Sequence, residues 1–332
     1  MARWVKAPTK LRKATVQDPS ELYRYETDSN PASVGASTML VSMGGFIDAG
    51  RTQRLLTEQL LTAHDHTVVA SFDLDQLLDY RGRRPMMTFE RDRFTSYEDP
   101  SLLLYRLVDQ DGQPFLLLTG SEPDYQWERT VEAVTQLVKA LGVDLTVSVH
   151  GIPMAVPHTR PLGVTAHATD PRLISQHAPV FGTVQVPASF SALLELRLGE
   201  SGGAALGFAV HVPHYLAQAE FADAALAGLA AVSGTTGLNL ATTDLAAAAG
   251  LNRAEIAREV EGSEEVAAVV AALERQYDTF MEGRERPGLL ATGVSELPSA
   301  DEIGAEFEAF LKDVAGDDAQ DDKKGKGEPG LR

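Results

Sequence analysis

Glycines, carboxylates and histidines follow several apolar runs of this sequence, and these residue types suit anion binding or proton transfer. The candidates for lining a site are Gly44, Gly45, Asp48, Gly120, Glu122, His150 and His214. Glycine N–H groups ahead of a helix can hold an anion. Asp48 or Glu122 is the preferred acid or base, and His214 is the preferred group to orient or transfer a proton. These residues predict a polar pocket, provided that the fold brings them together.

The stretch VSMGGFIDAG at residues 41–50 is open to two interpretations. Its glycines could present free N–H groups to an anion, or they could form a tight turn into a helix. The spacing matches neither a phosphate-binding P-loop nor a dinucleotide fingerprint. Asp48 would repel a phosphate, and it would cap the following helix well. Capping is therefore the preferred interpretation of this stretch.

A second stretch, GSEPD at residues 120–124, is also open to a functional and a structural interpretation. Its Ser121 could be a nucleophile with His150 or His214 as the base, or it could be the N-cap of a helix. The chain has no Gly-x-Ser-x-Gly elbow, no His-Glu-x-x-His motif and no cysteine. Capping is therefore favoured over a catalytic serine, and turn histidines are favoured over metal ligands. The sequence predicts no metal and no cofactor, and it leans against an enzyme.

A parallel sheet would bring the candidate residues to one place. Short apolar runs alternate with amphipathic stretches, which predicts a layered α/β domain. Strands are expected at residues 38–43, 66–72, 86–92, 101–109, 113–119, 143–150, 163–169, 182–186 and 204–212, and helices at 49–63, 123–141, 190–198 and 214–232. Ligands of open α/β sheets bind at the carboxyl ends of the strands. We therefore expect the candidate residues to share that edge of the sheet.

The organisation of the chain predicts one large domain with additions at both ends. Residues 1–29 are expected to form an N-terminal arm, 30–237 the α/β core, and 238–283 a helical extension packed on that core. Residues 284–332 are expected to form a linker, a short helix and a disordered, charge-rich tail. The core segment is long enough to hold the whole predicted sheet.

Composition narrows the class of partner. The chain has 332 residues, 44% of them hydrophobic, and a formal net charge of −18 at pH 7. This acidity argues against nucleic-acid binding, which needs lysines and arginines to displace counterions. No run reaches the roughly 18–20 apolar residues that span a bilayer, and the basic N-terminal segment lacks the apolar region of a secretory signal. We expect a cytoplasmic protein without nucleic-acid or membrane partners.

Ordered sequence blocks resemble the proteasome assembly chaperone family. The blocks are GGFIDAG at 44–50, GSEPDYQW at 120–127, HGIPMAVPHTRP at 150–161, ATDPRLI at 168–174 and VPHYLAQAEFADAALAGLAAVSGTTGL at 212–238. The resemblance is to the second-subunit branch of the family, and in particular to its longer bacterial members. It extends across residues 30–280.

This resemblance implies a three-layer α/β/α sandwich of the phosphorylase/hydrolase type. It also implies self-association, so we expect a homo-oligomer, with a trimer as the first expectation. Eukaryotic and archaeal relatives bind proteasome α-subunits during ring assembly, often through a C-terminal hydrophobic-Tyr-any tripeptide. This chain ends Gly330-Leu331-Arg332, so docking through such a tail is not expected.

Two functional hypotheses compete. The first is a non-enzymatic protein-binding protein of the assembly-chaperone type, with a partner such as a proteasome subunit. The alternative is a hydrolase or small-molecule binder with a pocket at the carboxyl ends of the strands. An apolar helical face could also dock a partner, although covering the sheet is the preferred interpretation. The residues of that face are Leu216, Phe221, Leu226 and Leu229.

Overall fold

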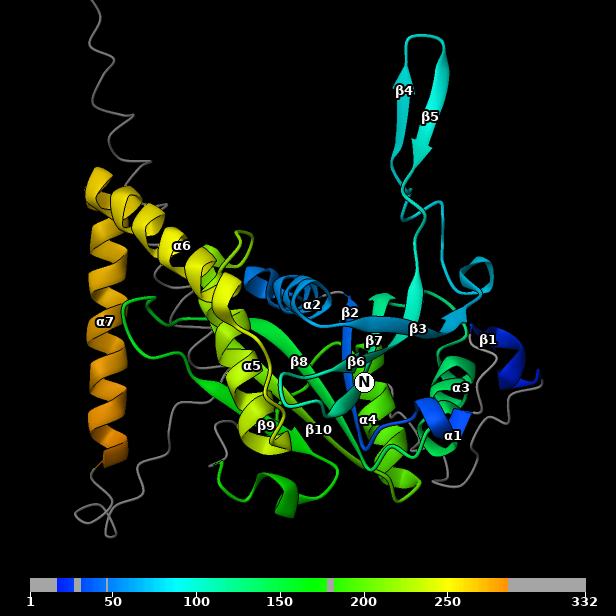
Figure 1. Cartoon of the computed structure of the whole chain (residues 1–332). Helices are drawn as coiled ribbons and strands as arrows, with labels where there is room; N and C mark the ends of the chain where they lie inside the picture. Colours follow the sequence, from blue (N-terminus) through cyan, green and yellow to red (C-terminus); the bar gives the residue numbers. More distant parts are fainter. Residues whose placement is uncertain (1–16, 27–30, 46, 178–181, 286–332) are drawn as a thin grey trace, which may run out of the picture. The chain divides into compact units, whose positions relative to one another are not determined.

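A mixed β-sheet forms the centre of the computed structural model (Figure 1). The structure describes residues 17–26, 31–45, 47–177 and 182–285. Within these residues the sheet has eight strands in the order β1-β3-β6-β7-β2-β8-β10-β9. The strands are β1 (Tyr23–Tyr25), β2 (Thr38–Gly44), β3 (His66–Phe72), β6 (Leu102–Val108), β7 (Pro114–Ser121), β8 (Leu145–Met154), β9 (Val164–Ala168) and β10 (Ala204–Pro213). β7, β2, β8 and β10 are parallel neighbours, and the other pairs are antiparallel.

Helices cover both faces of this sheet (Figure 1). α2 (Thr52–Ala63) and α5 (Ala222–Thr236) lie on one face, and α3 (Trp127–Ala140) and α4 (Phe190–Glu200) lie on the other. The shorter helical elements are η1 (Pro19–Leu22), α1 (Pro31–Val34), η2 (Ala49–Arg51), η3 (Leu74–Gln76), η4 (Pro171–Ile174) and η5 (His214–Leu216). The fold is an α/β/α sandwich, as the sequence predicted.

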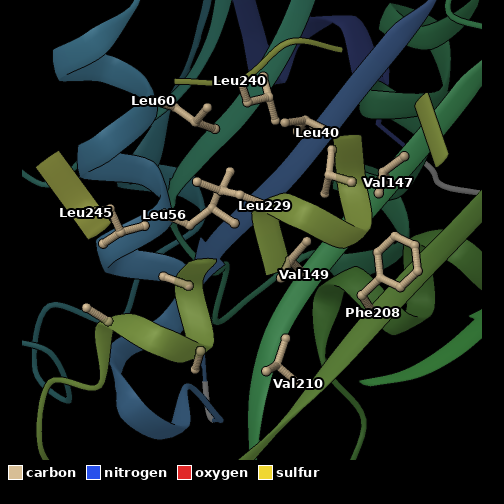
Figure 2. Packing of buried hydrophobic residues seen from close by; sticks show 14 of the residues in the cluster. Leu40, Leu56, Leu60, Val147, Val149, Phe208, Val210, Leu229, Leu240 and Leu245 are labelled. Carbon is tan, nitrogen blue, oxygen red and sulfur yellow. The ribbon is translucent and has the colours of Figure 1, made fainter. Parts of the chain in front are cut away.

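Two hydrophobic clusters fill the spaces between the three layers. In β2, Leu40 belongs to the cluster under α2 and α5, whereas Met39 and Val41 belong to the cluster under α3 and α4. Successive side chains of a strand point to opposite faces, so a strand that is covered on both faces is apolar almost throughout. Figure 2 shows the first cluster, in which Leu229 of α5 lies beside Leu56 of α2.

The apolar face of η5 and α5 covers the sheet, which was the preferred interpretation of its sequence. Leu216, Phe221 and Leu229 are buried, and Leu226 is partly buried against the same cluster. Burying one such side chain contributes about 1.5–3 kcal/mol to stability. This face therefore stabilises the sandwich and is not available to a partner.

Three predicted elements differ from the structure. The helix expected at 123–141 begins only at Trp127, after the N-cap Gln126, so Ser121 at the end of β7 does not cap it. Residues 182–186 form no strand, because their side chains are exposed and no neighbouring strand pairs with them. The helix expected at 214–232 is divided into η5 and α5. The division arises because the backbones of Ala217 and Phe221 exchange hydrogen bonds with Gly50, which holds this segment out of the helix.

Helices follow the sheet toward the C-terminus. α6 (Thr243–Gly262) contacts α5 and α2, and its Leu245 and Ile256 are buried in the cluster on that face. α7 (Glu264–Glu285) comes next, and the compact unit that contains the sheet extends through Tyr277. The domain limits drawn from the sequence stay predictions.

A two-stranded hairpin, β4 (Met87–Glu90) and β5 (Arg93–Tyr97), is inserted between β3 and β6 (Figure 1). Every residue of its two strands is exposed. The hairpin therefore contributes to neither hydrophobic cluster, although both of its strands carry apolar side chains.

Candidate functional site

The carboxyl ends of β2 and β7 meet at one edge of the sheet. Because these strands are parallel, Gly44 pairs with Ser121, next to Gly120. The chain continues from Gly44 to Gly45, which lies against Glu122: a Cβ added to Gly45 would be 2.8 Å from Glu122 Oε2. The structure thus brings four of the candidate residues together at this edge.

Glu122 is a buried carboxylate, 7% exposed, directly after β7. Its Oε1 accepts a hydrogen bond of 2.6 Å from the backbone N–H of Phe190, the first residue of α4. A helix N-terminus has unpaired N–H groups and a positive partial charge, so it stabilises a carboxylate. Glu122 therefore links the end of β7 to the start of α4.

A cavity of about 330 Å³ opens beside Glu122, and we name it the rim cavity. Its lining residues are Arg83, Glu122, Pro123, Asp124, Trp127, Pro187 and Ala188. The indole N–H of Trp127 donates to the Pro123 carbonyl oxygen at 2.6 Å. Arg83 forms an ion pair of 2.5 Å with Asp124. An indole and prolines beside carboxylates suit a small ligand that carries a positive charge or a hydrogen-bond donor.

Gly120 is explained by the packing of β6 against β7. Its φ is +134°, and a Cβ at this position would lie 1.9 Å from the carbonyl oxygen of Ser101. L-residues with a side chain rarely adopt this φ, and the close backbone approach leaves no space for one. The glycine is therefore required where β7 reaches the edge.

Asp48 lies in the turn from β2 into α2. Its carboxylate accepts hydrogen bonds from the backbone N–H groups of Gln53 at 2.8 Å and Arg54 at 3.3 Å, in the first turn of α2. It also accepts from the backbone N–H of Gly151 on β8. Burial raises the pKa of Asp48, and these hydrogen bonds oppose that shift. The carboxylate caps α2 and joins it to β8.

His150 lies on a face of the sheet, because β8 continues beyond it to Met154. Its ring centroid is 6.1 Å from that of His167 on β9. Burial, together with the neighbouring His167, lowers the pKa of His150 from 6.5 to about 4. His150 is therefore neutral at pH 7.

His214 lies at the carboxyl end of β10, the edge that Gly44 and Glu122 share, and it is exposed. Its ring packs edge-on against Tyr215, with the centroids 5.5 Å apart. In the part of the chain that the structure describes, no hydrogen bond joins His214 to Glu122 or Asp48. The carboxylates and this histidine thus share an edge without a hydrogen bond between them in the described residues.

Arg83, Trp127 and Pro187 line the rim cavity, although none of them was predicted from the sequence as a site residue. Trp127 closes the block GSEPDYQW that begins at Gly120, so its nearness to Glu122 could have been inferred. Arg83 and Pro187 are far from Glu122 in the sequence and carry no local signal.

None of the described helices is long and apolar enough to cross a membrane. The described residues also contain no group of three or more His, Asp or Glu side chains that could hold a metal ion.

A family model and two solved structures each match most of this chain. The PAC2 family model matches residues 43–260. A Mycobacterium tuberculosis protein of unknown function is 46% identical, with a TM-score of 0.77 over 83% of this chain and 95% of that chain. A Corynebacterium glutamicum protein of unknown function is 36% identical, with a TM-score of 0.75 over 79% of this chain and 98% of that chain.

A more distant structure shares the fold. A Mycobacterium tuberculosis proteasome-assembly chaperone homologue is 21% identical, with a TM-score of 0.65 over 70% of this chain and 99% of that chain. The comparison with curated proteins gives no match.

Proposed function

This chain belongs to the PAC2 family, and from that premise we propose that it is a cytoplasmic, self-associating protein that binds other subunits in the manner of an assembly chaperone. Support for a protein partner comes first from structural likeness, since a structure that shares this fold is described as a proteasome-assembly chaperone homologue. The partner class is a subunit of a larger complex, such as the proteasome.

The observation that carries this proposal is the exposed apolar surface of the β4–β5 hairpin. Phe89 is 58% exposed and Phe94 is 64% exposed, and their rings contact each other edge-on at 5.1 Å. Met86, Met87 and Tyr97 are exposed beside them. Aromatic residues and methionine are enriched in protein interfaces, and an isolated two-stranded hairpin is only marginally stable in water. A partner surface would stabilise it.

The resemblance implies self-association, which favours a second copy of this chain as the first partner of the hairpin. Within the hairpin, Glu90 and Asp92 offset Arg91 and Arg93, so apolar contact with a second copy meets no net charge of like sign. We therefore propose a homo-oligomer in which the hairpin forms part of the interface, and a trimer is the expected number.

Light scattering of the full chain tests this proposal. The wild type should give a multiple of 35.7 kDa, and the double variant Phe89→Ser/Phe94→Ser should shift toward the 35.7 kDa monomer. The matched control is Thr88→Ala/Ser96→Ala, which removes a hydroxyl pair on the same hairpin and should keep the wild-type mass. A wild type that is monomeric at every concentration would refute self-association.

The same variants test partner binding. Tagged wild-type chain should retain a defined subunit from a lysate of its own organism, and mass spectrometry identifies that subunit. The Phe89→Ser/Phe94→Ser variant should retain less of it, because the apolar contact area is lost. Equal recovery by both chains would place partner binding elsewhere on the surface.

A second candidate function is small-molecule binding in the rim cavity. The buried carboxylate of Glu122 beside the Trp127 indole supports it. A thermal-shift screen with small amines and amides should raise the melting temperature of the wild type. Glu122→Gln should lose this response, and Glu132→Gln, at an exposed position of α3, should keep it. If no compound of the screen raises the melting temperature, small-molecule binding in the rim cavity is refuted and protein binding stays the proposed function.

A further inference from the structure

A polar cluster lies on the sheet face that α4 covers, and the rim cavity does not include it. Ser148 lies on β8, His167 on β9 and Glu195 on α4. In the register of the sheet, Ser148 pairs with Gly207 of β10, and Gly207 pairs in turn with His167. Paired residues of neighbouring strands point to the same face, so these side chains share one surface.

His167 is oriented by a carboxylate. Its Nδ1 lies 3.0 Å from Glu195 Oε1 and 2.9 Å from Oε2, and the side chain of Glu195 is 16% exposed. A carboxylate on Nδ1 holds the proton there, which leaves Nε2 free to accept one. Glu195 thus fixes both the position of the imidazole and the tautomer that a general base requires.

The free edge of the imidazole and the serine hydroxyl converge over a glycine. A Cβ added to Gly207 would lie 2.6 Å from His167 Nε2 and also 2.6 Å from Ser148 Oγ. The two atoms are therefore separated by no more than twice that distance. No hydrogen bond between them is formed in the described part of the chain, and such bonds often tighten only when a substrate binds.

His150 completes the surroundings of Ser148. It is two residues further along β8, so its side chain lies on the same face. Its ring is 6.1 Å from that of His167, and burial together with His167 lowers its pKa to about 4. A neutral imidazole carries one N–H, which can donate to an oxyanion.

We propose that Ser148, His167 and Glu195 form a hydrolytic centre for esters of short carboxylic acids, with His150 as the oxyanion donor. A triad of this kind is recognised by geometry and roles, and it does not require the elbow motif that the sequence lacks. Ser148 is 8% exposed, which restricts the acyl group to a small one. The activity is independent of subunit binding by the hairpin.

The proposed reaction balances with water as its co-reactant. Ser148 Oγ attacks the ester carbonyl carbon while its proton moves to His167 Nε2, and the carbonyl oxygen becomes the oxyanion. The C–O bond to the alcohol then breaks, and the alcohol leaves with the proton from Nε2. Water next attacks the acyl-serine, its proton passes to Nε2, and this proton returns to Oγ as the carboxylic acid is released.

The test uses the full chain and two probes, p-nitrophenyl acetate and a small alkyl fluorophosphonate. Wild type should release p-nitrophenol, and the fluorophosphonate should label it with one phosphonyl group at Ser148. Ser148→Ala should lose the label and fall to the uncatalysed rate. Ser121→Ala, at a serine on the strand edge, should remain labelled and active. Labelling of the Ser148→Ala variant equal to that of wild type would overturn the proposal, as would an unlabelled wild type.

The variant Gly207→Ala tests whether the approach of His167 to Ser148 is needed for activity in a chain that still folds. The new Cβ would lie 2.2 Å from His167 Cε1, so this partly exposed ring has to swing away from Ser148. We expect at least a ten-fold loss of kcat with retained circular dichroism. The matched control Gly234→Ala adds a methyl group in open space on α5 and should keep full activity. Unchanged kcat in a folded Gly207→Ala chain would refute the convergence of the two groups.

Glu195 is a positioning residue, and the kinetics of its variants distinguish this role from a purely structural one. Glu195→Gln should lower kcat about 100-fold or more while KM stays constant, because the charge that stabilises the imidazolium is lost. Glu195→Asp should restore part of kcat. A purely structural role would instead lower the melting temperature and leave kcat per folded chain unchanged, which would remove Glu195 from the centre.

Discussion

The carboxylate of Glu122 and the backbone N–H of Phe190 are joined by a hydrogen bond of 2.6 Å, although the residues are 68 positions apart in the sequence. This contact fixes the start of α4 at the edge where β7 ends. The same helix carries Glu195, which orients His167. Glu122, which lines the rim cavity, thus contacts the first residue of the helix that carries the carboxylate of the polar cluster.

Removing this carboxylate should destabilise the protein. Glu122→Ala leaves the first N–H of α4 without its acceptor in a buried place, and we expect a loss of about 1–3 kcal/mol. Glu122→Gln retains an acceptor oxygen and should lose less. Urea unfolding measures both, and Glu132→Gln, at an exposed position of α3, should change stability by less than about 0.5 kcal/mol. Equal stability of Glu122→Ala and wild type would contradict the capping role.

Gly120 should not tolerate a side chain. In Gly120→Ala the methyl group would meet the Ser101 carbonyl oxygen at 1.9 Å, and φ would stay near +134°. The combined clash and strain should cost more than about 3 kcal/mol. The control is Gly234→Ala, which should be neutral or stabilising by up to about 1 kcal/mol because it lies in a helix with open space around it. Thermal unfolding compares the two, and a Gly120→Ala melting temperature near that of wild type would show that β6 and β7 can separate there.

His150 should make stability depend on pH. Its folded pKa of about 4 is below the ordinary 6.5 because burial and His167 disfavour the charged ring, with Glu195 partly opposing them. The unfolded chain therefore binds the proton first, so the contribution is complete above pH 6.5 and is lost as the pH falls toward 4. The full loss is about 3 kcal/mol. Urea unfolding across this range measures it.

The variant His150→Asn isolates this contribution from those of other groups. It cannot titrate, so the difference in unfolding free energy between wild type and variant should change across the same pH range. Asp48, whose pKa burial raises, remains in both chains and cancels in that difference. A difference that is constant with pH would show that His150 is not held neutral by its surroundings.

Arg129 should be required for the attachment of the N-terminal segment. It is 5% exposed, its guanidinium donates to the Asp18 carbonyl oxygen at 2.6 Å, and it pairs with Glu21 at 3.1 Å. Arg129→Met should lose about 2–4 kcal/mol, since several acceptors lose their donor together. Limited proteolysis should then cut near Asp18 earlier. Arg172→Met, which removes an exposed ion pair with Asp170, should cost about 0–1 kcal/mol and should not change the cleavage pattern.

The central strands could be predicted because strands that are buried on both faces consist mainly of apolar residues. β2, β7 and β10 lie between two helical layers, so most of their positions are apolar, and the runs at 38–43 and 204–212 identify β2 and β10. Residues 182–186 contain valines at alternate positions yet form no strand. Alternation alone does not supply the neighbouring strand that a ladder requires.

The candidate site was harder to predict because it depends on strand length and on distant contacts. The predicted strand at 143–150 would end at His150, but pairing with β10 continues β8 to Met154, so this ring lies on a face of the sheet. The bond between Glu122 and Phe190 and that between His167 and Glu195 join separate elements, and no local pattern encodes either one. Glycines at turns, in contrast, were visible in the sequence.

The hairpin is inserted at a point where its length can change without affecting the sheet. β3 and β6 pair directly with each other, and the backbone N–H of Glu98 bonds to the carbonyl oxygen of Met86 at 2.9 Å, which closes the base of the excursion. The excursion begins and ends at neighbouring strands, so its length places no demand on the register of the sheet. The hairpin can therefore differ in length or sequence without any change in the pairing of β3 with β6.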